Sequence, residues 1–189
     1  MSEPSRTMHA ADRADSQAHA ALIADYGALM TGVQAAPALL ANTAAWLMEV
    51  LPDLNWAGFY LVSGEPALID GEERPLLLLG PFIGRTACVD MPFGRGVCGC
   101  AAQQQQTILV PDVHAFPGHI ACDERSRSEL VVPFVVESAE DREPMLFGVL
   151  DLDSPLTGRF TDTEAKLCEH VLEILSSLMG PQTIGQLNY

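Results

Sequence analysis

The chain has 189 residues, of which 48% are hydrophobic and 19% charged. This composition excludes a disordered chain and a solvated coiled coil, and the length favours one domain with a single core. Ten Lys and Arg against 25 Asp and Glu give a net charge of −15 at pH 7. Because that charge repels nucleic-acid phosphates and anionic lipid head groups, we expect neither nucleic acid nor a membrane surface as a partner.

The sequence contains no apolar stretch long enough to span a bilayer, and its first residues lack the apolar core of a secretory signal. We therefore expect a cytoplasmic protein. Its cysteines are odd in number, and nothing directs the chain to an oxidising compartment, so we expect no structural disulfide framework. The five are Cys88, Cys98, Cys100, Cys122 and Cys168.

Three long helices are predicted. Residues 1–14 are polar and turn-rich, and we expect them to be mobile. Apolar residues then recur at helical spacing over residues 22–33 and again over 39–51, with Pro37 in the first turn of the second helix. Thr161 and Glu164 form a capping box at the start of the third helix, which ends before Gly180. We place one domain at residues 15–182 and a C-terminal tail at 183–189.

Six segments have the composition of β-strands: 54–62, 76–80, 86–91, 107–113, 130–137 and 146–152. Residues 63–75 are acidic and rich in Gly and Pro, which predicts a solvated hairpin loop. Most consecutive strands lack a crossover helix between them. The predicted fold is therefore α+β, with a central, roughly six-stranded antiparallel sheet flanked by helices.

Two thiols are candidates for chemistry. Cys98 follows a glycine-rich turn at the start of a short predicted helix, where backbone amides favour a thiolate and Arg95 could add positive charge. Cys122 belongs to a predicted surface loop beside His119, where a thiol is accessible. Judged from the residues alone, Cys98 is preferred, with burial as a small apolar side chain as the alternative. Taken alone, Cys88 is predicted to be a core residue in a strand.

The spacing of the cysteines and histidines gives no Cys-x-x-Cys pair and matches no structural zinc module, so we predict no metal. Three acidic residues are more informative. Glu129 begins an apolar strand, and Asp151 and Asp153 project from one face of another. Like charges so close raise each other's pKa, which suits a proton donor or a site for an ammonium group. The alternative is the solvated end of a strand.

Trp56 and Tyr60 share one face of their predicted strand, where they are core residues or walls of a pocket for a small apolar group. The residues around them belong to a set of motifs that follow one another in order between residues 55 and 154, within a similarity that runs from about residue 22 to residue 178. These are NWAGFY (55–60), LGPF (79–82), GRGVCG (94–99), DVH (112–114), GHIACD (118–123), SxSE (126–129) and GVLDLDS (148–154). By these motifs the chain resembles the free methionine-(R)-sulfoxide reductases, which are built on a single GAF domain.

The resemblance implies a GAF fold and an enzyme, without a cofactor, that reduces free L-methionine-(R)-sulfoxide by thiol chemistry. In the family the residue matching Cys122 is the nucleophile and that matching Cys88 resolves it, with Cys98 as a second resolving thiol or a relay. The sulfenic acid on the nucleophile becomes an intramolecular disulfide, which a dithiol such as thioredoxin reduces. A homodimer is expected, as is common for GAF domains.

The resemblance also assigns the substrate contacts. At least one of Glu129, Asp151 and Asp153 is the acid that polarises the sulfoxide oxygen, and the others hold the substrate's ammonium group. Trp56 and Tyr60 pack on the S-methyl group, and loop amides near Ile120 and Ala121 take the carboxylate. Cys100 departs from the family pattern, and packing is the preferred explanation. The rival function is a non-catalytic GAF sensor that binds a small ligand or acts as a thiol redox switch.

Overall fold

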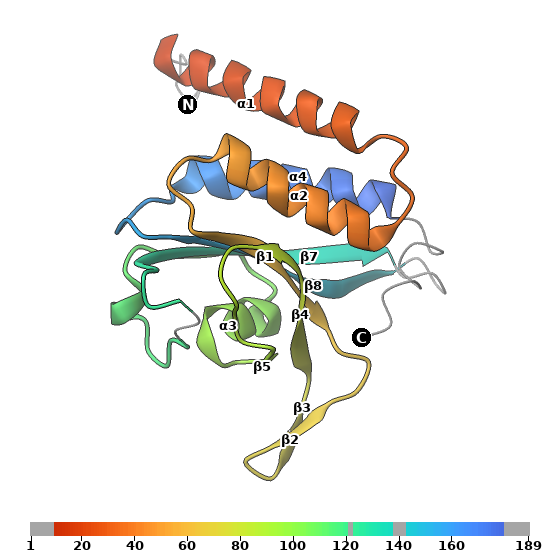
Figure 1. The fold of residues 1–189 in the computed structure, drawn as a ribbon, viewed down its shortest axis with the longest axis vertical. Coiled ribbons are helices and arrows are strands. Elements are labelled where there is room, and N and C mark those ends of the chain that lie inside the picture. The colour runs from red at the N-terminus through yellow and green to blue at the C-terminus, as the bar shows by residue number, and fades with distance from the viewer. Residues whose placement is uncertain (1–9, 121–122, 138–142, 180–189) are drawn as a thin grey trace, which may run out of the picture.

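A computed structural model describes residues 10–120, 123–137 and 143–179. Its centre is a six-stranded antiparallel sheet in the order β5-β4-β1-β8-β7-β6. The strands are β1 (Trp56–Val62), β4 (Leu76–Ile83), β5 (Asp90–Pro92), β6 (Ile108–Val110), β7 (Ser128–Glu137) and β8 (Pro144–Ser154). A separate hairpin of β2 (Ala67–Ile69) and β3 (Glu72–Arg74) projects from the body (Figure 1). The predicted α+β fold with a six-stranded antiparallel sheet is confirmed.

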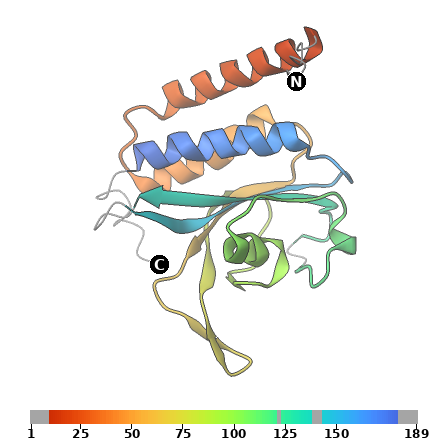
Figure 2. The same cartoon turned by 180° about the vertical axis from the view of Figure 1, so that it is seen from behind.

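The helices divide between the two faces of the sheet. The helices α2 (Ala36–Val50) and α4 (Asp162–Leu178) lie on one face, and α1 (Ala10–Met30) packs outside them (Figures 1 and 2). The shorter α3 (Gly96–Gln104) and the loops around it cover the other face. The layers are therefore α1, the α2–α4 pair, the sheet, and α3. A short 3-10 turn, η1 (Val113–Ala115), follows β6.

Alternate residues of the same strands build two different interiors. The side chains of Phe59, Leu150 and Leu152 are fully buried in the main apolar core, which lies between the sheet and α1, α2 and α4. Residues one position away, such as Tyr60 and Val149, belong to a second and smaller cluster beneath α3. This follows from the two-residue period of a strand. The small cluster is the one that adjoins the buried carboxyl groups Glu129 and Asp151.

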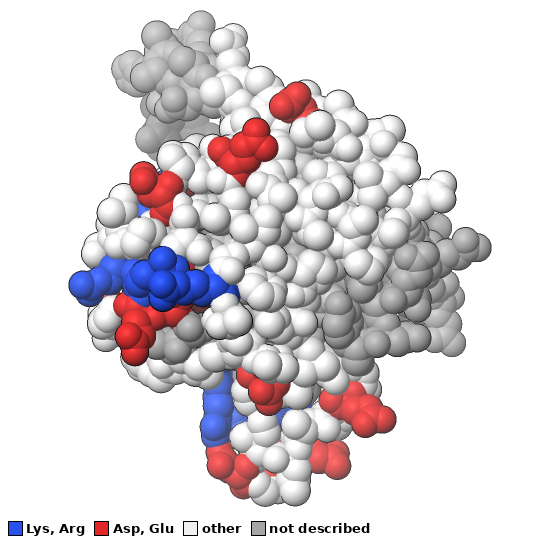
Figure 3. Space-filling model, viewed as in Figure 1, with Lys and Arg blue, Asp and Glu red and all other residues white. Residues whose placement is uncertain are grey.

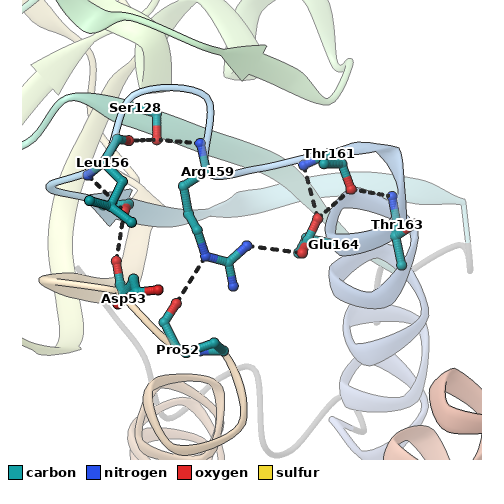
Figure 4. A network of polar contacts seen from close by, with 9 residues as sticks. Pro52, Asp53, Ser128, Leu156, Arg159, Thr161, Thr163 and Glu164 are labelled. Carbon is teal, nitrogen blue, oxygen red and sulfur yellow. Dashed lines mark hydrogen bonds and ion pairs between the residues drawn. The ribbon is translucent and has the colours of Figure 1, made fainter. Parts of the chain in front are cut away.

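A polar network joins the ends of four elements near the site described below (Figure 4). The Arg159 guanidinium donates to the Pro52 carbonyl at 2.9 Å and to Glu164 at 2.9 Å. Glu164 accepts from the backbone of Thr161, which completes the predicted capping box of α4. Ser128 and Ser154, which are cross-strand partners, donate to the carbonyls of the loops beyond β8 and α2. The network therefore anchors the adjacent residues Glu129 and Asp153.

The predicted element boundaries need three corrections. The first helix begins at Ala10, so residues 10–14, predicted to be mobile, are helical. The hairpin loop at 63–75 contains the two short strands β2 and β3. The strand predicted at 86–91 is reduced to β5, and residues 84–89 are irregular. No helix in the described part of the chain is long and apolar enough to cross a membrane.

The surface charge on the side seen in Figure 3 is mixed. Basic side chains gather in two places, over the β2–β3 hairpin and beside the loops next to the sheet, and both groups adjoin acidic side chains. Among the ion pairs of the described residues, Arg74 pairs with Glu72, Arg95 with Asp70, and Arg125 with Asp123. The described residues on this side therefore show no extended basic surface.

Candidate active site

Three carboxyl groups meet on the α3 face of the sheet. Strand pairing places Glu129 of β7 directly opposite Asp153 of β8, with Asp151 two residues along the same face. On the other side of β8, β1 places Trp56 opposite Asp153 and Gly58 opposite Asp151. The predicted shared face of Asp151 and Asp153 is thus present, and β7 adds Glu129 to it. These acids do not form a solvated strand end, because Glu129 and Asp151 are each only 6% exposed.

The aromatic residues of β1 form a stack next to the carboxyl groups. The Trp56 ring lies between Tyr60, at a centroid distance of 5.8 Å, and Phe82, at 5.4 Å. A Cβ at Gly58 would lie 2.6 Å from the Trp56 ring and 2.4 Å from the Phe82 Cβ, so the strand needs glycine there. The indole Nε1 donates to the Arg85 carbonyl at 3.1 Å. Trp56 and Tyr60 are therefore buried residues that also border the acidic cluster.

Two small cavities open beside these groups and share Asp123, Asp151 and Asp153 in their walls. The larger has about 20 Å³ of free volume and is also lined by Cys98, His119, Ile120 and Glu129, among others. The smaller, of about 10 Å³, is bordered by Trp56 and Tyr60. Each has room for about one water molecule. The five predicted acidic and aromatic residues therefore surround one compact site.

Burial and mutual repulsion favour the protonated forms of the three acids. The pKa of Glu129 is raised well above its ordinary value by burial and then by the charge of Asp153. Burial and the charges of Asp153 and Glu129 raise the pKa of Asp151. The pKa of Asp153 rises to about 6, because burial outweighs a hydrogen bond from Ser126 and the nearby His119. Such groups can hold and release a proton near neutral pH.

His119 is the basic side chain closest to this cluster among the contacts of the described residues. Its Nε2 lies 3.6 Å from Oε2 of Glu129, and the imidazole is 16% exposed. Burial lowers the pKa of His119, against the raising effect of Asp153. The neutral imidazole can therefore donate to or accept from the Glu129 carboxyl group, which makes His119 a polar partner rather than a fixed positive charge.

Cys98 is part of the site, but its chemistry differs from the prediction. It stands in the first turn of α3, as expected, yet it is 1% exposed and its Sγ lies 3.9 Å from Oε1 of Glu129. Burial, followed by the charges of Asp151 and Glu129, raises the pKa of the Cys98 thiol well above its ordinary value. Arg95 does not offset this effect, since it pairs with Asp70. The prediction of an ionised Cys98 at the helix terminus is wrong.

Cys88 lies in the irregular segment before β5, so its prediction as a residue in a core strand is also wrong. The hydroxyl of Tyr60 donates to the Cys88 carbonyl at 3.1 Å, which fixes this segment over β1. Cys88 is disulfide-bonded, whereas Cys98, Cys100 and Cys168 carry free thiols. The predicted site residues Ala121 and Cys122 lie outside the described residues, so the structure does not test them.

The loops supply three polar residues that were not predicted to have a role: Asn55, Asp123 and Ser126. The Asn55 amide donates to Asp123 at 3.2 Å and to Ser126 at 3.0 Å. Arg125 holds the pKa of Asp123 below its ordinary value through hydrogen bonds to the carboxylate. Asp123 and Ser126 both line the larger cavity, next to Ile120. All three lie within the motifs quoted above, which was the available signal.

One group of donors could hold a metal ion. Single donor atoms of Cys98, Glu129 and Asp151 lie within 4.8 Å of one another, and all three residues are buried. None of the histidines weighed in the sequence analysis belongs to this triplet. The prediction of no metal considered cysteine and histidine spacing only, and it could not include two carboxylates that sheet pairing brings together.

Fold and site together define a GAF domain: the sequence pattern of that domain matches residues 10–179. The chain is 48% identical to the free methionine-R-sulfoxide reductase of Escherichia coli over 162 residues, which cover 86% of this chain and 88% of the relative. It is therefore a member of the free methionine-R-sulfoxide reductase family.

Two solved structures show how far the likeness extends. The free methionine-R-sulfoxide reductase of Neisseria meningitidis, crystallised with its substrate, is 35% identical with a TM-score of 0.72 over 96% of this chain and 98% of that one. A putative GAF sensor protein from Burkholderia vietnamiensis is 40% identical with a TM-score of 0.73, over 90% and 98% respectively. Both share the sheet and helix arrangement described above.

Proposed function

We propose that this protein reduces free L-methionine-(R)-sulfoxide to L-methionine. The observation that carries the proposal is the buried cluster of Glu129, Asp151 and Asp153 beside Cys98, in a chain that belongs to this reductase family. Sulfoxide reduction requires a proton donor for the sulfoxide oxygen, and carboxyl groups with raised pKa values supply one. A free amino acid also brings an ammonium group, which the remaining carboxylates can pair with after losing their protons.

The reaction begins with the Cys122 thiolate. It attacks the sulfur of the sulfoxide, the oxygen takes up a proton, methionine leaves, and Cys122 becomes a sulfenic acid. The Cys88 thiol then attacks the sulfenic sulfur, water leaves, and a Cys88–Cys122 disulfide forms. Support comes from Cys88, which is disulfide-bonded while Cys98, Cys100 and Cys168 are free. Cys98, with its raised pKa, is a reserve thiol in this scheme rather than the nucleophile.

The carboxyl groups divide the remaining tasks. Glu129 is the proton donor that we prefer, because it contacts His119, which offers a path for its reprotonation. Asp151 and Asp153 face the substrate ammonium, with Trp56 and Tyr60 against the S-methyl group and the backbone at Ile120 and Ala121 near the carboxylate. The aromatic stack next to the small cavities supports this orientation.

Three further points complete the proposal, and the first two rest on the family resemblance. A dithiol protein such as thioredoxin returns the disulfide to the dithiol state by exchange. The protein forms a homodimer. It acts in the cytoplasm, where such reductants keep thiols reduced.

The test is turnover with dithiothreitol as the reductant, on the free R epimer, the free S epimer and a peptide-bound sulfoxide. We expect activity on the free R epimer alone, and its loss in Cys122→Ser but not in Cys100→Ser. Glu129→Gln should reduce kcat by about 10²- to 10⁴-fold, the usual contribution of a general acid. Absence of turnover on every sulfoxide would leave the GAF sensor as the function. An unchanged rate in Glu129→Gln at every pH would exclude Glu129 as the acid.

A further inference from the structure

The candidate site contains a set of side chains that could bind a metal ion, although sulfoxide reduction requires no metal. The Cys98 thiol from α3, the Glu129 carboxyl group from β7 and the Asp151 carboxyl group from β8 converge from three different elements. Their donor atoms lie within 4.8 Å of one another, with Cys98 Sγ and Glu129 Oε1 3.9 Å apart. Thiolate, carboxylate and imidazole are the ligands of protein zinc sites.

Zinc–sulfur bonds of about 2.3 Å and zinc–oxygen bonds of about 2.0–2.2 Å in a tetrahedron place neighbouring donors roughly 3.5 Å apart. The observed separations exceed this by about an ångström at most. A rotamer change of Cys98 or Glu129 is enough to close such a gap. The cavity that these residues line has about 20 Å³ of free volume, which is room for a bare ion but not for an amino acid.

A second, independent observation points to a ligand at this place. Asp151 is only 6% exposed, and its Oδ1 atom is buried without a hydrogen-bond partner. A buried carboxyl oxygen without a partner loses its hydration without compensation. Among the described residues, none of those that line the cavity is a lysine or an arginine. A divalent cation would coordinate the unpartnered oxygen and compensate the charge of the carboxyl groups once they lose their protons.

We propose that Cys98, Glu129 and Asp151 form a zinc site that holds the ion with three protein ligands. His119, whose Nε2 lies 3.6 Å from Glu129 Oε2, is not among the donors that lie within 4.8 Å of one another, so a water molecule is the expected fourth ligand. The ion displaces the protons of the thiol and carboxyl groups. Cys98 is free while Cys88 is disulfide-bonded, so the site does not depend on reduction of that disulfide.

The consequence for activity rests on the proposed function. Glu129 and Asp151 cannot bind zinc and serve the sulfoxide at once. Zinc would therefore compete with the substrate and inhibit turnover reversibly, so that a chelator restores the rate. Zinc binding itself is independent of any reaction and can be measured without substrate.

The experiment is a titration of the whole protein with Zn²⁺ against a chromophoric chelator, and with Co²⁺ to detect the sulfur-to-cobalt absorption in the near ultraviolet. The principal variant is Cys88→Ser/Cys122→Ser, which removes the two proposed redox thiols. We expect one equivalent of zinc and the cobalt–thiolate band in this variant and in the wild type. Cys98→Ser should lose the band, while the matched control Cys100→Ser, two residues along the same helix, should keep it.

The carboxyl ligands are tested by Glu129→Gln and Asp151→Asn. Each should weaken zinc binding by more than about 10-fold, since even partners outside the ligand set change metal affinity by about 10- to 100-fold. Circular dichroism of every variant shows whether it has folded, and Cys98→Ala is the second variant if Cys98→Ser has not. Zinc binding that survives in Cys98→Ser, or that disappears in Cys88→Ser/Cys122→Ser, would overturn the proposed site.

Turnover separates this proposal from the proposed function. An active reductase that binds no zinc would refute the zinc site and leave the reaction intact. A protein that binds zinc through Cys98 and reduces no sulfoxide would refute the proposed function and leave the zinc site intact. Inhibition by zinc that is lost in Cys100→Ser, and not in the Cys98 variants, would place the ion elsewhere and also refute the site.

Discussion

The two faces of one sheet are used in opposite ways. On the face beneath α2 and α4, the strands bury Phe59, Leu150 and Leu152 in a predominantly apolar core, which favours folding. On the face beneath α3, the next residues along the same strands bury Glu129 and Asp151, whose charged forms burial disfavours. The comparison shows that the core beneath α2 and α4 supplies stability, while the face beneath α3 holds groups that are costly to bury and useful for proton transfer.

The largest expected effect on stability comes from the apolar face. Leu150→Ala removes a fully buried side chain and leaves a cavity between β8 and the helices. We expect the free energy of unfolding to fall by about 2–5 kcal/mol. Denaturant unfolding measures this loss. Turnover per folded molecule should stay close to that of the wild type, because Leu150 points away from the site; a large loss of kcat in folded protein would contradict the division between the faces.

The next effect concerns Asp153 and pH. Its pKa in the folded protein, about 6, lies above the ordinary value of 3.8. Between these values the folded state binds more protons than the unfolded state, so the free energy of unfolding falls as pH rises from about 4 to about 6. At about 1.4 kcal/mol per pKa unit the change is on the order of 2 kcal/mol. Asp153→Asn should flatten this part of the stability curve, and an unchanged slope would show that Asp153 is not responsible.

The smallest effect belongs to the cap of α4. Thr161 accepts a hydrogen bond from the backbone of Thr163, and Glu164 returns to the Thr161 backbone. Thr161→Ala should lower the free energy of unfolding by about 0.5–2 kcal/mol. Thermal unfolding at pH 7 detects it, with Thr163→Ala as the neighbouring control. If the loss in the control is as large, the cap is not the cause.

Because side chains alternate along a strand, the face of the sheet on which each one lies could be predicted. The contacts between strands could not. The sequence GVLDLDS was enough to place Asp151 and Asp153 on one side. It could not show that Glu129 lies opposite Asp153, because the register of β7 against β8 depends on the whole sheet. The same limit hid the contact of His119 with Glu129.

The two errors on the cysteines have related causes. Residues 86–91 have strand-like composition, but the side chains of Trp56 and Tyr60 bind the carbonyls of Arg85 and Cys88 in place of a neighbouring strand. Cys98 does stand at a helix terminus, as predicted. The effect of that terminus is outweighed by burial and by three carboxyl groups that come from distant parts of the chain.

The most direct test of the central claim is a paired measurement on Asp151→Asn, with turnover of free methionine-(R)-sulfoxide and denaturant unfolding at pH 7 on the same preparation. Because the pKa of Asp151 is higher in the folded than in the unfolded state, folding at this pH must either protonate the carboxyl group or bury its charge, and both cost stability. We expect a variant that is more stable and at least about 10²-fold less active. A variant that is less stable, or as active as the wild type, would contradict the claim that this face gives up stability for chemistry.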